Sequence, residues 1–195
     1  AHGATPEEGI NAGMLALSTL AYYYEDKNLN HIINCYSDLY GKGVNAYVES
    51  PDMGKNSLNV GLLSYENEEF SMVVNFRHVD TANKDELLKN IKEASKPLTI
   101  EEMSVSPLLF YPRDSVLVAT LLTAYQEETG DYTTPAKAIG GGTYAKEADN
   151  IVAFGMEFPG WNSMMHSPGE SCKKEDLFKS ISIYARAIND LGKKL

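Results

Sequence analysis

The sequence predicts an α+β fold, with helices covering one face of a small antiparallel sheet. Three observations predict it. Apolar residues recur at helical spacing in several segments, and the first of these segments begins with a capping pattern. Apolar and polar residues then alternate in two neighbouring segments separated by a polar turn, which indicates a β-hairpin. Residues 3–105 thus read as two helices, a hairpin, a helix and a strand.

Composition excludes some classes of partner. The chain has 195 residues, and its 27 acidic and 17 basic residues give a net charge of −10, which argues against binding to nucleic acid or to an anionic membrane. It contains no apolar run long enough to span a bilayer, and its start, AHGATPEEG, does not resemble a signal peptide. Two distant cysteines, Cys35 and Cys172, favour reduced thiols in a cytoplasmic protein, with one disulfide as the alternative.

The first two helices follow from local signals. In residues 5–8 (TPEE), Thr5 is placed to cap the first amides, proline fits the first helical position and Glu8 completes a capping box. Apolar residues at helical spacing then predict a helix over residues 6–23. A second helix is predicted over residues 29–39, after a short polar break.

The hairpin is predicted by period-two patterns on either side of the turn YENEE. Leu58, Val60 and Leu62 alternate with polar or small residues before it, and residues 70–76 alternate again after it. Ser71, Asn75 and Arg77 therefore project from the face opposite the apolar one. If helices cover the apolar face, Arg77 stands on the open face, either as a ligand-binding group or as an ordinary surface arginine.

The rest of the chain reads as alternating helical, extended and loop segments. A boundary is predicted at residues 106–107, and Gly130 is expected to close the helix that precedes it. The last helix carries an apolar stripe of Leu177, Ile181, Tyr184, Ile188 and Leu191. The predicted helices cover residues 83–95, 114–129 and 175–191, and the predicted strands cover residues 98–105, 136–139 and 151–155.

Candidate functional residues lie in loops and near the start of the chain. His166 lies in the Gly/Pro-bounded segment FPGWNSMMHSPGE, where a metal ligand, a catalytic base and a solvated surface residue are all open interpretations. His2 precedes the first predicted helix, where it could donate to an oxyanion or be an exposed terminal residue. The glycine-rich loop GGGTYA, which includes Gly141, Gly142 and Thr143, allows close approach of its backbone to a ligand or forms a plain turn.

Four of these segments together resemble the dinuclear-zinc exopeptidase and amidohydrolase family, which includes aminoacylase, carnosinases and bacterial dipeptidases. AHGATPEEGINAG resembles the histidine motif of the family's lid domain, and VVNFR resembles the strand that delivers an arginine to the substrate. GGGTYA with FPG, and then MMHSPGE with IYARAI, resemble the end of the bacterial Xaa-His dipeptidase branch. The matches occur in the family's order and span nearly the whole chain.

The resemblance implies a role for each matched residue. His166 corresponds to the final zinc-binding histidine, and His2 to the lid histidine that steadies the tetrahedral oxyanion. Arg77 corresponds to the arginine that pairs with the terminal carboxylate of the substrate, an anion that suits a guanidinium fork. Gly141, Gly142 and Thr143 correspond to the loop that lines the substrate cleft.

The resemblance also implies an organisation. Residues 1–108 correspond to a lid domain that lacks its start, with helices on an antiparallel sheet. Residues 109–195 correspond to the last helix-strand segment of an α/β zinc-exopeptidase catalytic domain. In the family, the H-x-D ligand pair, bridging aspartate, Glu-Glu pair and last acidic ligand lie before the lid, whereas this chain resembles sequence that begins inside the lid. The chain is therefore expected to be a fragment, metal-free and inactive alone, of a parent that binds two zinc ions.

The function expected from this resemblance is hydrolysis of unblocked dipeptides by a metal-activated water in the parent protein. One alternative keeps the machinery and changes the substrate to an N-acyl amino acid. Another is a non-catalytic binding or dimerisation module built from the lid sheet. A dipeptide is the expected partner, and surfaces that a fragment exposes give a further expectation of self-association.

Overall fold

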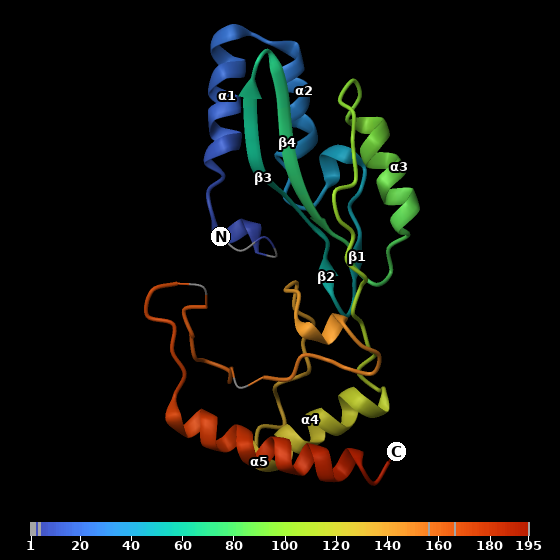
Figure 1. Ribbon diagram of the computed structural model, residues 1–195, viewed down its shortest axis with the longest axis vertical. Helices are drawn as coiled ribbons and strands as arrows, with labels where there is room; N and C mark the ends of the chain where they lie inside the picture. Colours follow the sequence, from blue (N-terminus) through green and yellow to red (C-terminus); the bar gives the residue numbers. More distant parts are fainter. Residues whose placement is uncertain (1–2, 4, 156, 166, 195) are drawn as a thin grey trace. The chain divides into compact units, whose positions relative to one another are not determined.

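The computed structural model describes residues 3, 5–155, 157–165 and 167–194, which belong to two compact units (Figure 1). Unit 1 comprises residues 1–108 and 138–141, and unit 2 comprises residues 109–137 and 142–195. Helices occur together with small antiparallel sheets, which confirms the predicted α+β class. Among the described helices, none has both the length and the apolar character needed to cross a membrane.

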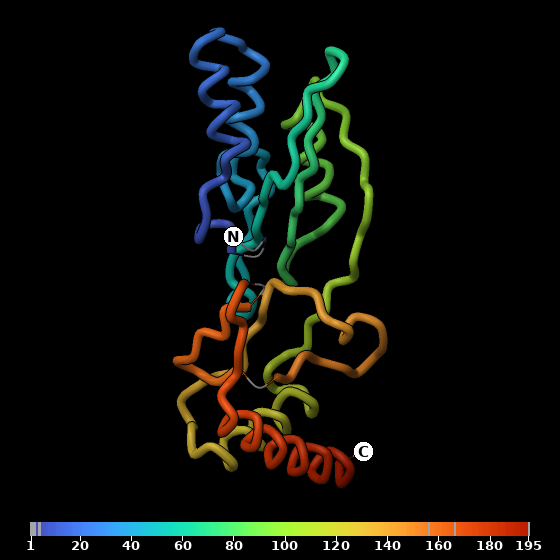
Figure 2. Tube along the Cα trace, turned by 60° about the vertical axis from the view of Figure 1, so that its left-hand side comes forward, coloured from blue at the N-terminus to red at the C-terminus, as the bar shows by residue number. Residues whose placement is uncertain are grey.

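Unit 1 places two helices, α1 and α2, as a layer along a hairpin of β3 and β4 (Figures 1 and 2). Its elements are η1 (Pro6–Glu8), α1 (Ala12–Tyr24), α2 (Lys27–Tyr36), η2 (Lys42–Val44), β1 (Glu49–Ser50), β2 (Gly54–Lys55), β3 (Ser57–Glu66), β4 (Glu69–Arg77) and α3 (Lys84–Ala94).

The first helix begins later than predicted. Residues 6–8 form only a 3-10 turn, and the Thr5 hydroxyl contacts the Glu8 carboxylate instead of capping an amide. Gly9 then adopts an extended backbone, and Asn11 caps α1 by accepting a hydrogen bond from the amide of Met14 at 3.1 Å. The capping-box prediction was therefore wrong, because a second cap six residues downstream lies where the helix packs on β3.

The hairpin has the predicted turn and face, with one irregularity. Asn67 and Glu68 form the tight turn with left-handed backbones at φ 52° and 67°, a conformation that suits two-residue hairpin loops. The register shifts at Gly61, so that Val60 pairs with Val74 and Leu62 with Val73. Because one extra residue reverses the side-chain alternation, Leu62 points to solvent instead of the core, contrary to prediction.

The core of unit 1 lies between the helices and the apolar face of the hairpin. Gly13 allows α1 to approach β3 closely, since a Cβ atom there would lie 2.5 Å from the Leu63 Cδ1 atom. The buried residues that form this core are Leu17, Ile32, Cys35, Tyr36, Val44, Ala46, Leu58, Val60 and Leu87. Burying so many large side chains supplies the main driving force for folding this unit.

Two features of unit 1 differ from the sequence prediction. The strand predicted over residues 98–105 is absent, because this extended segment pairs with no neighbouring strand among the described residues. A short hairpin of β1 and β2 was not predicted. Next to this hairpin, the buried side chain of Asn56 donates to the Tyr40 carbonyl at 2.8 Å and accepts from the amide of Val48.

Unit 2 consists of two packed helices and long irregular segments. Its elements are α4 (Val116–Thr129), η3 (Tyr144–Lys146) and α5 (Lys174–Leu191). Gly130 closes α4 with φ 74°, as predicted. The strands predicted over residues 136–139 and 151–155 are absent, because neither segment has a hydrogen-bonded strand partner among the described residues.

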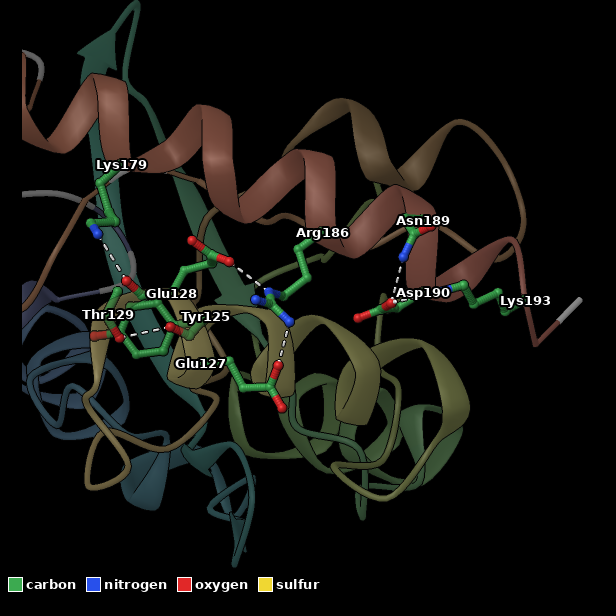
Figure 3. Close-up of polar contacts among 9 residues, drawn as sticks. All are labelled: Tyr125, Glu127, Glu128, Thr129, Lys179, Arg186, Asn189, Asp190 and Lys193. Atoms are coloured by element: carbon green, nitrogen blue, oxygen red, sulfur yellow. Dashed lines mark hydrogen bonds and ion pairs between the residues drawn. The ribbon is translucent and has the colours of Figure 1, made fainter.

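The face of α5 that packs on α4 is not the predicted stripe. Ser180, Ile183 and Ala187 are the buried residues of α5, and Ile183 and Ala187 form a small cluster with Ala124 of α4. Ion pairs from Arg186 to Glu127 and Glu128 join the two helices at the rim of this contact (Figure 3). Large side chains of the predicted stripe are exposed instead: Leu177, Ile181, Tyr184 and Ile188.

Candidate functional site

Arg77 ends β4 on the face predicted for it, at the root of the hairpin. The register places Ser57 opposite Arg77 and Asn59 opposite Asn75. These four residues share one face of the two strands, since side chains two residues apart project to the same side. The root of the hairpin is therefore polar on the face opposite the core.

The guanidinium of Arg77 is held by groups from distant parts of the chain. Its Nε donates to the Asn75 Oδ1 atom at 2.9 Å, and its Nη1 donates to the Gly140 carbonyl. Gly3 lies next to the guanidinium, because a Cβ atom built there would lie 3.4 Å from Arg77 Nη2. We call the following residues the hairpin-root cluster: Gly3, Ser57, Asn59, Asn75, Arg77 and Gly140.

The segment that follows His2 is tethered to the same cluster. The buried Ser57 hydroxyl donates to the Gly3 carbonyl at 3.3 Å. Further along, the Asn11 amide group donates to the Val60 carbonyl at 2.7 Å and approaches Asn59 Oδ1 at 3.5 Å. Two points of the amino-terminal segment are thus attached to β3, on either side of η1.

The cluster has the chemistry of an anion-binding site. No described carboxylate lies within ion-pair distance of Arg77, and Nη2 has no hydrogen-bond acceptor among the described residues. A guanidinium with unused donors suits a carboxylate, which can accept two parallel N–H bonds. The positive charge of Arg77 is therefore available to a bound anion.

The glycine-rich loop contributes Gly140 to the cluster. Gly141 belongs to unit 1 with it, whereas Gly142 and Thr143 belong to unit 2. The Thr143 hydroxyl begins η3 by accepting from the amide of Ala145 at 3.2 Å. The substrate-binding role of Gly141, Gly142 and Thr143 stays a prediction.

The two histidines singled out in the sequence, His2 and His166, lie outside the described residues. Their roles in oxyanion stabilisation and zinc binding therefore stay predictions. Among the residues that the structure describes, no three His, Cys, Asp or Glu side chains come together as a metal site.

A second pair of reactive residue types lies in the core of unit 1. Cys35 Sγ is 3.7 Å from the Nε2 atom of His31 and donates to the Ala94 carbonyl at 3.3 Å. Burial raises the pKa of the Cys35 thiol, which disfavours the thiolate that a nucleophile requires. The burial of Cys35 therefore favours a structural role for the pair.

Sequence reasoning did not assign a role to Ser57, Asn59 or Asn75. Counting residue pairs outward from the turn at residues 67–68 would have placed Leu58 opposite Arg77. The bulge at Gly61 moves Ser57 into that position. A glycine inside a strand pattern is a known signal for a bulge, and it was the one available clue to this arrangement.

Comparison with known proteins finds relatives along almost the whole chain. No protein-family model matches it. Proteins of Staphylococcus aureus (strain USA300) and Staphylococcus saprophyticus, each named "Putative dipeptidase", are 31% identical to it over 199 residues. These alignments cover 97% of this chain but 42% of each relative, so the chain spans about two fifths of the curated relatives it matches.

Proposed function

We propose that this chain is the carboxyl-terminal part of a cytoplasmic zinc-dependent dipeptidase. The observation that carries the proposal is the 31% identity to proteins named as dipeptidases, which extends over 97% of the chain. In this proposal residues 1–108 belong to the lid of that enzyme, and residues 109–195 belong to the end of its catalytic domain. The greater length of the relatives supports a longer parent protein.

In the proposed enzyme, Arg77 binds the terminal carboxylate of the dipeptide. The geometry of the hairpin-root cluster supports this role, because Asn75 and Gly140 hold the guanidinium while Nη2 keeps its donors. A charge-assisted hydrogen bond of this kind contributes about 1.5–3 kcal/mol. The lid histidine of the family, His2 here, would stabilise the oxyanion that forms at the scissile carbonyl.

The described residues do not make a zinc site by themselves, because such a site needs three or four protein ligands. We propose that His166 is one ligand and that the remaining ligands come from other sequence of the dipeptidase. When bound, zinc supplies an activated water and polarises the carbonyl. The contribution proposed for the described residues is recognition of the substrate carboxylate.

The test is a substrate comparison in the full-length enzyme. We expect hydrolysis of free dipeptides, and an Arg77→Ala variant should lose roughly 10- to 100-fold in kcat/KM on them. The same dipeptides with an amidated carboxyl end are the matched control, since they lack the group that Arg77 binds. Arg77→Lys should restore activity in part, because a point charge cannot reproduce the guanidinium fork.

Other outcomes would contradict the proposal. Faster hydrolysis of acetylated or succinylated amino acids than of free dipeptides would make the enzyme a deacylase. An equal loss on free and amidated dipeptides in Arg77→Ala would remove the role of Arg77 in binding the carboxylate. An inactive full-length protein whose elution in size-exclusion chromatography changes with dipeptide would indicate a binding or dimerisation module.

A further inference from the structure

We propose that Asn75 is a positioning residue, which orients the Arg77 guanidinium for the substrate carboxylate. This inference rests on the proposed function of Arg77. Asn75 Oδ1 accepts the hydrogen bond of Arg77 Nε at 2.9 Å, from two residues earlier on the same face of β4. Because Nε is part of the guanidinium plane, a fixed acceptor there restrains the plane and leaves the Nη2 group without a described acceptor.

A neutral acceptor suits this purpose better than a charged one. An aspartate at position 75 could hold Nε equally well, but its charge would compete with the substrate for the guanidinium. The amide oxygen of Asn75 restrains the side chain and leaves the positive charge uncompensated. No described carboxylate forms an ion pair with Arg77, which agrees with a site that reserves this charge for a ligand.

Asparagine at this position has no evident structural use. Asparagine is depleted in β-strands, and Asn75 is exposed, so neither strand propensity nor core packing explains it. Its cross-strand partner Asn59 makes a different contact, with the side chain of Asn11 at the start of α1. Asn59 therefore contacts the amino-terminal segment, and Asn75 contacts Arg77.

Positioning matters because an arginine side chain has many rotamers. A guanidinium that is free in solution must lose this freedom when it binds a ligand, and the loss weakens binding. The contacts from Asn75 and Gly140 remove much of it in advance. The effect of Asn75 should therefore be transmitted entirely through Arg77.

The first experiment observes the Arg77 side chain directly, by NMR of its Nε–H group in the 195-residue chain. In Asn75→Ala the Nε–H resonance should shift, and its exchange with water should accelerate. Asn75→Asp should keep the slow exchange, because it retains the acceptor. Ser71→Ala is the matched control, since Ser71 lies on the same face of the same strand and makes no described contact with Arg77.

The second experiment is a double-mutant cycle in the full-length enzyme. Asn75→Ala should lower kcat/KM on free dipeptides by roughly 3- to 10-fold, mainly through KM, and should leave amidated dipeptides unaffected. In an Arg77→Ala background the same substitution should change kcat/KM by less than about twofold, because the residue through which it acts is gone. The Asn75→Asp variant should keep the Arg77 side chain in place and still bind the substrate carboxylate more weakly than the original enzyme.

The outcomes separate this inference from the proposed function. If Arg77→Ala lowers kcat/KM on free dipeptides and Asn75→Ala does not, the positioning role is wrong and the proposed function stands. An equal loss for Asn75→Ala in both backgrounds would also overturn it, since that indicates a route independent of Arg77. No effect of Arg77→Ala would overturn both.

Discussion

The two units of this chain differ in what their helices bury. In unit 1, large side chains of α1, α2, β3 and α3 meet in one core, and Leu58 at its centre is 0% exposed. In unit 2, the buried cluster between α4 and α5 has three members, Ala124, Ile183 and Ala187. Most large apolar residues of α5, among them Ile181 and Ile188, are exposed. Unit 1 therefore has the burial expected of a self-contained unit, and unit 2 has far less.

This difference shows that an apolar stripe marks a helix face that is suited to burial. It does not show which other surface covers that face. The stripe of α5 is exposed, with Ile181 at 59% and Ile188 at 72%. Exposed apolar patches of this kind mark surfaces that contact another element or protein.

The comparison of the two units is tested first by a substitution in the core of unit 1, where the largest effect on stability is expected. Leu58→Ala should lower the free energy of unfolding by about 2–5 kcal/mol, because a cavity replaces a fully buried side chain. Leu62→Ala is its matched control in the same strand, where the bulge leaves Leu62 67% exposed, and should cost less than about 0.5 kcal/mol.

Urea unfolding followed by circular dichroism measures both variants, and Trp161, the one tryptophan of the chain, reports on unit 2 by fluorescence. The Leu58→Ala transition should move in circular dichroism while the Trp161 transition stays in place. Joint movement of the two signals would mean that the units unfold as one body, and the comparison between them would fail.

A smaller effect is expected at the contact of α4 with α5. Ile183 is 4% exposed and Ile181 is 59% exposed, although they lie two residues apart on α5. Ile183→Val should cost about 0.5–1.5 kcal/mol, and Ile181→Val should stay within about 0.5 kcal/mol. Trp161 fluorescence during urea unfolding measures both. Equal costs would show that another surface covers the outer face of α5 in solution.

The smallest effect concerns the loop after α4. Hydrogen bonds from Thr134, Thr133 and Tyr125 hold the pKa of the Asp131 carboxyl below its usual range. A lowered folded-state pKa means that the stabilisation is present above the unfolded-state pKa and is lost as the pH falls through the folded-state value.

Asp131→Asn should therefore lower the melting temperature slightly near neutral pH, and the difference from the original chain should shrink below about pH 4. Thermal melts of both proteins between neutral pH and pH values below about 4 measure this difference. A difference that does not change with pH would assign the effect to packing of the loop instead of to the charge.

Local signals in the sequence were sufficient for several elements. Asn83 caps α3 through the amides of Asp85 and Glu86, where a helix was predicted to begin, and Gly130 ends α4 as predicted. The hairpin turn and the face of Arg77 also agree with prediction. These features depend on neighbouring residues and on a constant period, which a sequence contains in full.

Part of the candidate site was predictable and part was not. Arg77 could be placed on the open face by counting along β4, but its contacts with Asn75, Gly140 and Gly3 join segments far apart in the chain. The sequence contains no measure of how such segments come together. Asn75 was visible as a neighbour of Arg77 on one face, and only the structure gave it a partner.

What the sequence by itself determined is the set of helices and the hairpin, because capping, period and turn preferences are local properties. Tertiary structure decided which segments of the chain pack or pair with one another. It moved the start of the first helix to Asn11, reversed the alternation at Gly61 and chose the inner face of α5. It also left three predicted strands without a ladder. The physical reason is the same in each case: strand pairing and burial are properties of two surfaces, and the sequence describes one segment at a time.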